Sequence, residues 1–213
     1  NQIFIFFLIP ILTAFSHIYL IKYNEKSKII IFLILSIFIF STFKYHLRFN
    51  EDRKFHELQN INFKNSVPAK LIDQKLKNLN WISPNFKNPF QEVNLIKFAI
   101  KTLENDKNNI MLVTNYLFLD TIIEKKLNST SRTFDPISFP NKNNQYYDVY
   151  KNMFINKLKA KEIKNIYLFY GFTVNDDQIS RYIGTYLSKD CFEKETIIPE
   201  LVRLKLKDCK DLR

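Results

Sequence analysis

The side chains with the widest range of chemistry gather in one short segment, residues 43–58, which reads FKYHLRFNEDRKFHEL. Two of the three histidines of the chain lie in it, close to arginine, lysine and acidic residues. The candidates for binding a phosphate are His46, Arg48, Arg53, Lys54 and His56. A guanidinium can bind a phosphate through two parallel hydrogen bonds, and a lysine adds a point charge. Because a long apolar run precedes the segment, this chemistry predicts a site for the phosphate of a lipid carrier at a membrane surface.

A second interpretation of the same segment is structural. If residues 45–60 are helical, Arg48 and Asp52 are i,i+4 neighbours, and so are Asp52 and His56. The segment would then be a salt-bridged juxtamembrane stem that carries a soluble domain away from the bilayer. The residues alone leave both interpretations open. The histidines are ten positions apart and have no cysteine partner, so we expect neither a metal site nor a cofactor.

Two apolar runs precede this segment, residues 3–21 and 29–45. The first would span about 28 Å as a helix, close to the thickness of the hydrocarbon layer. We therefore predict a transmembrane helical hairpin over residues 1–44, with both ends on the same side of the membrane. Because the chain begins inside an apolar run, we expect it to be part of a longer protein.

Residues 61–213 read as a soluble α/β domain, because short apolar strands alternate with amphipathic helices. This alternation predicts a small Rossmann-like domain with a mainly parallel sheet. The expected strands are residues 79–83, 109–114, 165–170 and at least one strand within 195–206; the expected helices are residues 69–76, 90–104, 117–127, 145–160 and 176–187. Ligands of such sheets bind at the carboxyl ends of the strands, here Ser83, Thr114 and Gly171.

The net charge of +11 does not indicate a nucleic-acid partner, because the lysines are scattered and not gathered on one predicted face. Membrane lipid is the expected partner, since basic residues lie beside the second apolar run. The chain has only two glycines, which excludes the glycine-rich phosphate loops.

The two cysteines, Cys191 and Cys209, both lie near the end of the domain. A disulfide between them would close a loop of roughly 20 residues and stabilise the fold by about 3 kcal/mol. Disulfides persist outside the cytoplasm, so a bond would favour an extracytoplasmic domain. Two unrelated buried thiols explain the sequence equally well. The lysines and arginines that flank the apolar runs are nearly balanced; they slightly favour a domain on the inside and do not decide the orientation.

Two stretches, YHLRFNEDRKFHEL at residues 45–58 and VPAKLIDQKLKNLNWISP at residues 67–84, resemble the C-terminal part of a group of bacterial multi-spanning membrane proteins. These proteins are similar to the GT-C class of glycosyltransferases, which includes the dolichyl-phosphate-mannose mannosyltransferase type. The resemblance implies a polyprenyl-phosphate-linked sugar donor, an inner-membrane location and a periplasmic domain.

The GT-C class carries its catalytic acid in the first extracytoplasmic loop, a region with no counterpart in this chain. No residue here takes over that role, and we expect the chain by itself to be inactive as a transferase. The alternative is a non-enzymatic, membrane-anchored α/β domain that binds a ligand or a partner.

Overall fold

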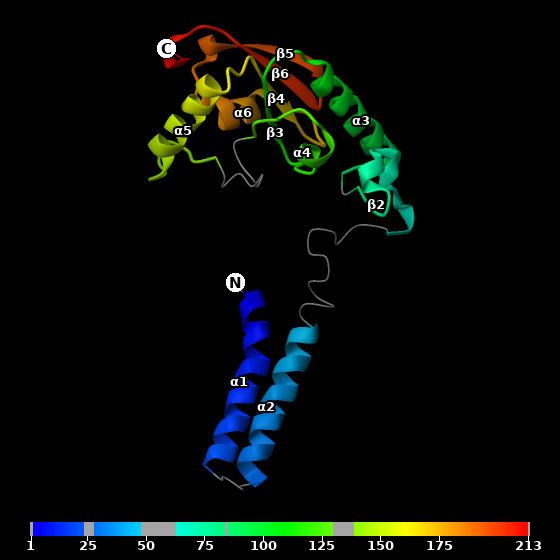
Figure 1. The fold of residues 1–213 in the computed structure, drawn as a ribbon, viewed down its shortest axis with the longest axis vertical. Coiled ribbons are helices and arrows are strands. Elements are labelled where there is room, and N and C mark those ends of the chain that lie inside the picture. The colour runs from blue at the N-terminus through cyan, green and yellow to red at the C-terminus, as the bar shows by residue number, and fades with distance from the viewer. Residues whose placement is uncertain (1, 24–27, 48–62, 84, 130–138, 213) are drawn as a thin grey trace. The chain divides into compact units, whose positions relative to one another are not determined.

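A computed structural model describes residues 2–23, 28–47, 63–83, 85–129 and 139–212. The chain forms two compact units, Asn1–Ile61 and Asn62–Arg213 (Figure 1).

In its described residues, the N-terminal unit contains two helices, α1 (Gln2–Lys22) and α2 (Lys28–His46), which pack against each other. Pro10 lies inside α1, and the hydroxyl of Thr13 donates a hydrogen bond to the carbonyl of Ile9, 2.8 Å away. In the described part of the chain, α2 is the one helix long and apolar enough to cross a membrane, and none of its side chains is buried. The described side chains of α1, from Leu8 to Lys22, form a shorter apolar helix. A hairpin that spans the membrane twice therefore stays a prediction.

The second unit is built on a four-stranded sheet in the order β3-β4-β6-β5. Its strands are β3 (Ile110–Thr114), β4 (Asn165–Phe169), β5 (Phe192–Ile198) and β6 (Leu201–Leu206). β3 and β4 are parallel, and the register places Thr114 opposite Phe169. β6 is antiparallel to both of its neighbours. The fold is thus mixed α/β, as expected, but the prediction of a mainly parallel sheet is wrong, and no Rossmann fold is present in the described residues.

The reason for the difference is the hairpin formed by β5 and β6. Its two strands are joined directly at Pro199 and Glu200, so they pair antiparallel with each other. The hairpin then adds to the sheet through β6, which pairs with the full length of β4. A parallel arrangement would have required a crossover helix between the two strands.

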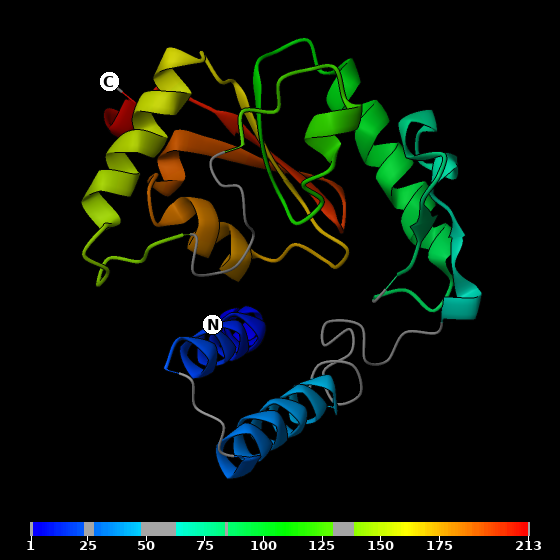
Figure 2. The ribbon, with the colours of Figure 1, turned by 60° about the horizontal axis from the view of Figure 1, so that its bottom comes forward.

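Helices cover both faces of the sheet (Figures 1 and 2). Every residue of β3 and β4 is therefore buried. Helix α3 (Pro89–Asn105) covers one face and packs Val93, Ile96, Ala99 and Leu103 against it. It begins at Asn88, whose side chain accepts a hydrogen bond from the backbone N–H of Phe90. Helices α5 (Tyr147–Ala160) and α6 (Asp176–Ile179) cover the other face, and α6 continues into a π-helical turn, Ser180–Gly184.

Three predicted elements differ from the observed ones. The helix expected at residues 69–76 is replaced by two 3₁₀ turns, η4 (Ala69–Leu71) and η5 (Gln74–Leu76), which are separated at Asp73, the cap of η5. The strand expected at residues 79–83 is reduced to β2 (Asn80–Trp81), which pairs with β1 (Val67–Pro68) in a separate two-stranded sheet. The helix expected at residues 117–127 is only α4 (Leu119–Ile122). After α4 the chain returns beside β3, where the carbonyl of Leu127 accepts a hydrogen bond from the N–H of Leu112. The chain must leave the helical conformation to return beside β3, so the helix ends early. The returning segment gives the edge strand β3 a backbone partner.

Short 3₁₀ turns complete the unit: η3 (Phe63–Asn65), η4 (Ala69–Leu71), η5 (Gln74–Leu76), η8 (Lys189–Cys191) and η9 (Lys210–Leu212).

Candidate functional site

Most of the side chains predicted to bind a lipid phosphate lie outside the described residues: Arg48, Arg53, Lys54 and His56. His46 is the last residue of α2 and is exposed to solvent. Lys44 lies in the same last turn, and its ammonium group is 6.0 Å from the centre of the Phe40 ring. The end of α2 is therefore cationic, which suits a position beside lipid phosphates.

A buried polar cluster lies at the carboxyl ends of β3 and β4 and is centred on Glu92 of α3. Glu92 is only 1% exposed. One oxygen accepts a hydrogen bond from the hydroxyl of Tyr116 at 2.6 Å, and the other accepts one from the indole N–H of Trp81 at 2.8 Å. Glu92 also lies in the first turn of α3, where the helix dipole favours negative charge. The cluster therefore joins three segments that are distant in sequence.

Gly171, which follows β4, makes room for this cluster. A Cβ atom at this position would lie 2.5 Å from the hydroxyl oxygen of Tyr116 and 3.5 Å from Glu92 Oε1. Burial raises the pKa of Tyr116, and the hydrogen bond to Glu92 raises it further, so the phenol stays protonated and remains a donor. Since both Glu92 oxygens are engaged and enclosed, the cluster stabilises the end of the sheet and presents no open carboxylate to a ligand.

A second polar network lies at the opposite end of the same strands, centred on Asp106. One oxygen of its carboxylate accepts hydrogen bonds from the Tyr167 hydroxyl at 2.7 Å and from the Asn165 amide at 2.6 Å. Burial acts to raise the pKa of Asp106, but these bonds and those from Asn108 outweigh it and hold the pKa below its usual value. The network thus fixes the loop before β3 to the start of β4.

The network extends across the sheet on the same face. Arg203 of β6 is the register partner of Tyr167, and its guanidinium donates to both oxygens of Glu195 on β5 at 2.7 and 3.1 Å. Lys205 lies 2.7 Å from Glu195 as well. These opposite charges pair with one another, so this part of the sheet carries a balanced, partly exposed polar surface.

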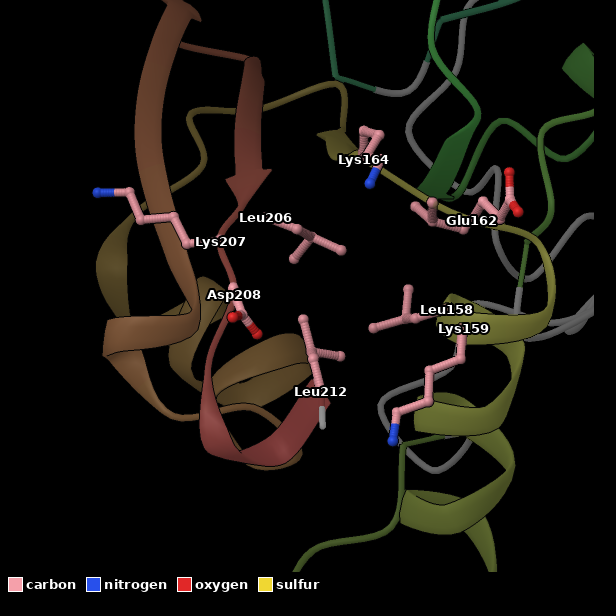
Figure 3. A pocket seen from close by; sticks show the side chains of 9 residues that line it. Leu158, Lys159, Glu162, Lys164, Leu206, Lys207, Asp208 and Leu212 are labelled. Carbon is pink, nitrogen blue, oxygen red and sulfur yellow. The ribbon is translucent and has the colours of Figure 1, made fainter.

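A cavity of about 650 Å³ opens beside this end of the sheet, between the last turn of α5, the end of β6 and η9. Three leucines point into it from these three elements: Leu158, Leu206 and Leu212 (Figure 3). Charged side chains of both signs surround the leucines, namely Lys159, Glu162, Lys164 and Asp208. Lys207 extends away from the opening and lies 3.2 Å from Glu193 (Figure 3). An apolar floor with a rim of mixed charge suits an amphipathic ligand.

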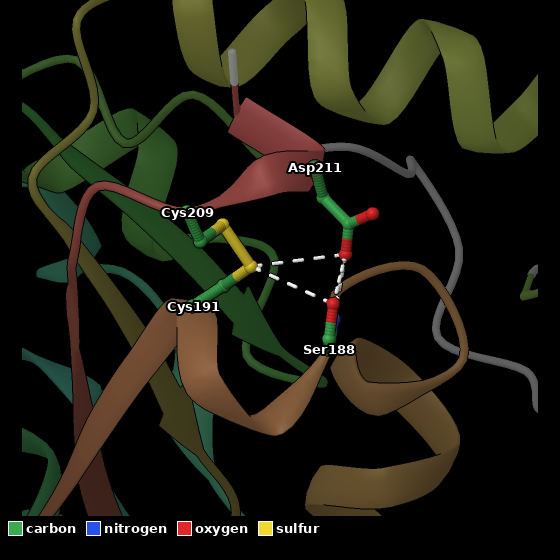
Figure 4. The surroundings of a disulfide bond; sticks show 4 residues. All are labelled: Ser188, Cys191, Cys209 and Asp211. Carbon is green, nitrogen blue, oxygen red and sulfur yellow. Dashed lines mark hydrogen bonds between the residues drawn. A yellow bond between two sulfur atoms is a disulfide. The ribbon is translucent and has the colours of Figure 1, made fainter.

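A disulfide joins Cys191 to Cys209 (Figure 4). The two Cα atoms are 5.1 Å apart. Asp208 directly precedes Cys209 and Leu212 follows it by three positions, so the bond restrains the segment that forms one wall of the cavity. Beside the bond, the backbone N–H of Ser188 donates to the carboxylate of Asp211 at 2.9 Å, and the Ser188 hydroxyl donates to the same oxygen. The hydroxyl bond and then the backbone bond lower the pKa of Asp211. The C-terminal segment is thus attached to the start of β5 by covalent and polar bonds.

In the part of the chain that the structure describes, no group of three or more histidine, cysteine or acidic side chains is placed to hold a metal ion. Comparisons with protein-family models, with curated proteins and with solved structures find no match to this chain. The functional argument therefore rests on the residues themselves.

The Glu92 cluster and the cavity were not predicted from the sequence. A signal for Glu92 was present, because it shares the i, i+4 spacing with Ile96 and so lies on the buried stripe of α3. A lone acid on an apolar helix face points to a buried hydrogen-bond network. The cavity had no comparable signal, since it depends on how the C-terminal segment packs beside α5.

Proposed function

We propose that this chain is a membrane-anchored α/β binding domain that works on the extracytoplasmic side of its membrane. The observation that carries the proposal is an apolar helix without buried side chains, α2, in the same chain as a disulfide-bonded domain. A helix of this length and composition is stable in a bilayer. A disulfide is maintained in an oxidising compartment. The cavity lined by Leu158, Leu206 and Leu212 is the position for an amphipathic ligand.

Labelling of single introduced cysteines in whole cells tests the anchor and the sidedness together. Asn144→Cys lies in an exposed turn of the domain, and Lys28→Cys lies at the exposed start of α2. We expect a membrane-impermeant maleimide to modify Asn144→Cys in intact cells and Lys28→Cys only after lysis. Cys191 and Cys209 do not react while they are bonded.

The chain should also stay in the membrane pellet after extraction with alkaline carbonate. Release of the chain by carbonate would contradict the anchor. Labelling of Asn144→Cys only after lysis would place the domain in the cytoplasm and contradict the sidedness.

A second candidate function is participation in glycosyl transfer from a polyprenyl-phosphate sugar. The cationic last turn of α2, with Lys44 and His46, favours it, because lipid phosphates lie at this depth. Arg48, Arg53 and Lys54 follow directly in the sequence. In this proposal the chain contributes binding of the lipid phosphate, and the catalytic acid comes from elsewhere in a larger protein.

Binding of polyprenyl phosphate to the chain in nanodiscs, measured by native mass spectrometry, tests this role. We expect Arg48→Ala/Arg53→Ala to weaken binding by about tenfold, because two charge-assisted phosphate contacts are removed. The matched control is Lys142→Ala/Lys161→Ala, which removes two exposed charges from the soluble domain and should leave binding unchanged. Equal binding by the arginine variant and the parent chain would rule out the phosphate role. A loss of binding in Lys164→Ala alone would assign the phosphate to the leucine-lined cavity instead.

A further inference from the structure

The first segment of the soluble unit forms a thin layer over helix α3, which we call the α3 cover and define as residues 63–83. It contains η3, β1, η4, η5 and β2, and it lies beside α3 (Figures 1 and 2). Val67 and Ile72 are buried in the same apolar cluster as Val93 and Ile96 of α3. The cover is thus fixed to the domain by its inner side.

Two polar bonds add to this attachment. The ammonium group of Lys75 donates to the backbone carbonyl of Ile122 at 3.0 Å, at the end of α4. The indole N–H of Trp81 donates to Glu92 of α3. These bonds attach the cover to α3 and to the end of α4, and most of its remaining side chains are exposed.

Large apolar side chains are exposed on the cover and on the start of α3 beside it. Leu79 is 59% exposed, Phe90 is 50% exposed and Leu71 is 37% exposed. Single exposed apolar residues are common on soluble proteins, but here three lie within residues 71–90 of the sequence. Each of them presents apolar side-chain area that is available for contact with the interfacial region of a bilayer.

The same stretch of the chain is strongly cationic. Residues 63–90 contain five lysines and one aspartate, which gives a net charge of +4 (five minus one). The aspartate, Asp73, is half-buried and caps η5 by accepting a hydrogen bond from the N–H of Lys75. The lysines at positions 64, 70, 77 and 87 are exposed. Exposed leucine and phenylalanine among lysines is the pattern of peripheral binding to anionic lipid.

We propose that the α3 cover, together with Phe90, is a docking surface for the anionic phospholipid headgroups of the membrane that holds α2. The proposal rests on the proposed function in one respect, because it needs α2 to be a membrane anchor. The charge complements anionic headgroups, and Leu71, Leu79 and Phe90 supply the apolar contact. The cover is also the first part of the domain that follows α2 in the chain. Docking would hold the soluble unit against the membrane surface.

The only tryptophan of the chain, Trp81, lies in the cover, so quenching of its fluorescence measures how close the cover is to the lipid. The full chain is reconstituted in vesicles that contain a lipid with a headgroup-attached quencher. One set is phosphatidylcholine, and the other has about one-third phosphatidylglycerol. We expect Trp81 fluorescence to be quenched at least twofold more in the anionic vesicles, and about 0.5 M salt to remove the difference.

Two variants separate the charged from the apolar contribution. Lys70→Glu/Lys77→Glu should abolish the difference between the two lipid compositions. Leu79→Ser/Phe90→Ser should reduce quenching in both compositions by at least half, because the apolar contact is lost. The control is Lys142→Glu/Lys161→Glu, which changes the total charge equally on other elements and should quench like the parent chain.

The outcomes distinguish this inference from the function proposed above. If the chain resists carbonate extraction but Trp81 is quenched equally in both vesicle types, the anchor stands and the docking surface is refuted. If Trp81 is not quenched by either composition, the cover faces solvent or another protein, and the inference is equally overturned. If carbonate releases the chain, the anchor itself fails.

Discussion

Removing the disulfide should lower the free energy of unfolding of the soluble unit by about 3 kcal/mol. The variant is Cys191→Ala/Cys209→Ala, in which residues 18 apart in sequence are no longer joined. The bond closes a loop that contains β5 and β6, so its loss allows the unfolded chain many more conformations. Urea unfolding of the full chain in detergent micelles, followed by Trp81 fluorescence, measures the change.

The reduced parent chain is the matched control for this experiment. It keeps both sulfur atoms and loses only the bond, so it separates the effect of the cross-link from that of removing buried side-chain volume. Both cysteines are buried, at 0% and 6% exposure, so the native bond should resist mild reductant and break only after unfolding. A reduced parent chain as stable as the oxidised one would show that the cross-link does not stabilise the fold.

The apolar pattern of the sequence was sufficient to predict the central part of the domain. Residues 109–114 and 165–170 contain β3 and β4, and residues 90–104 and 145–160 nearly coincide with α3 and α5. These segments are buried on several sides, so their pattern reflects contacts that any fold of the same class would need. Local pattern and final structure agree where burial is greatest.

The order and direction of the strands could not be predicted in the same way. β5 carries Glu193, Lys194 and Glu195 in succession, because it is an edge strand with few buried side chains. Its antiparallel insertion through β6 depends on pairing with β4, which is more than thirty positions earlier in the sequence. The local sequence contains no information about that partner.

The candidate site shows the same division. The residues expected to bind a lipid phosphate were chosen by side-chain type and by their position after an apolar run of the sequence. Binding of phosphate by these residues stays a prediction. The Glu92 cluster arises from contacts among α3, β2 and the segment after β3. Its two hydrogen-bonded pairs are 11 and 24 positions apart in sequence, but only the packing of the cover on α3 brings their polar atoms together.

Replacing Glu92 with leucine should lower the free energy of unfolding by about 2–4 kcal/mol. The substitution leaves the buried Tyr116 hydroxyl and the half-buried Trp81 indole N–H without their acceptor, and an unsatisfied buried group costs about 1–3 kcal/mol. Glu92→Gln should cost less, because its carbonyl oxygen can still accept from one of the two donors. Urea unfolding measures both variants, and the emission of Trp81 should change in the folded state of each. Equal stability of Glu92→Leu and the parent chain would contradict the cluster as a stabilising element.

The two glycines of the chain offer an independent test of the same cluster. Gly171→Ala places a Cβ atom 2.5 Å from the Tyr116 hydroxyl oxygen, so the ring must shift away from Glu92 at a cost of about 1–3 kcal/mol. Gly184→Ala is the matched control, because its new Cβ atom meets nothing closer than 3.5 Å. Neither glycine has a positive φ angle, so both substitutions gain equally from the reduced freedom of the unfolded chain. Gly184→Ala should therefore be neutral or slightly stabilising, and the difference between the two variants isolates the close approach of Tyr116 to Gly171. If Gly171→Ala were as stable as Gly184→Ala, Tyr116 would be free to move, and its hydrogen bond to Glu92 would not hold this end of the sheet.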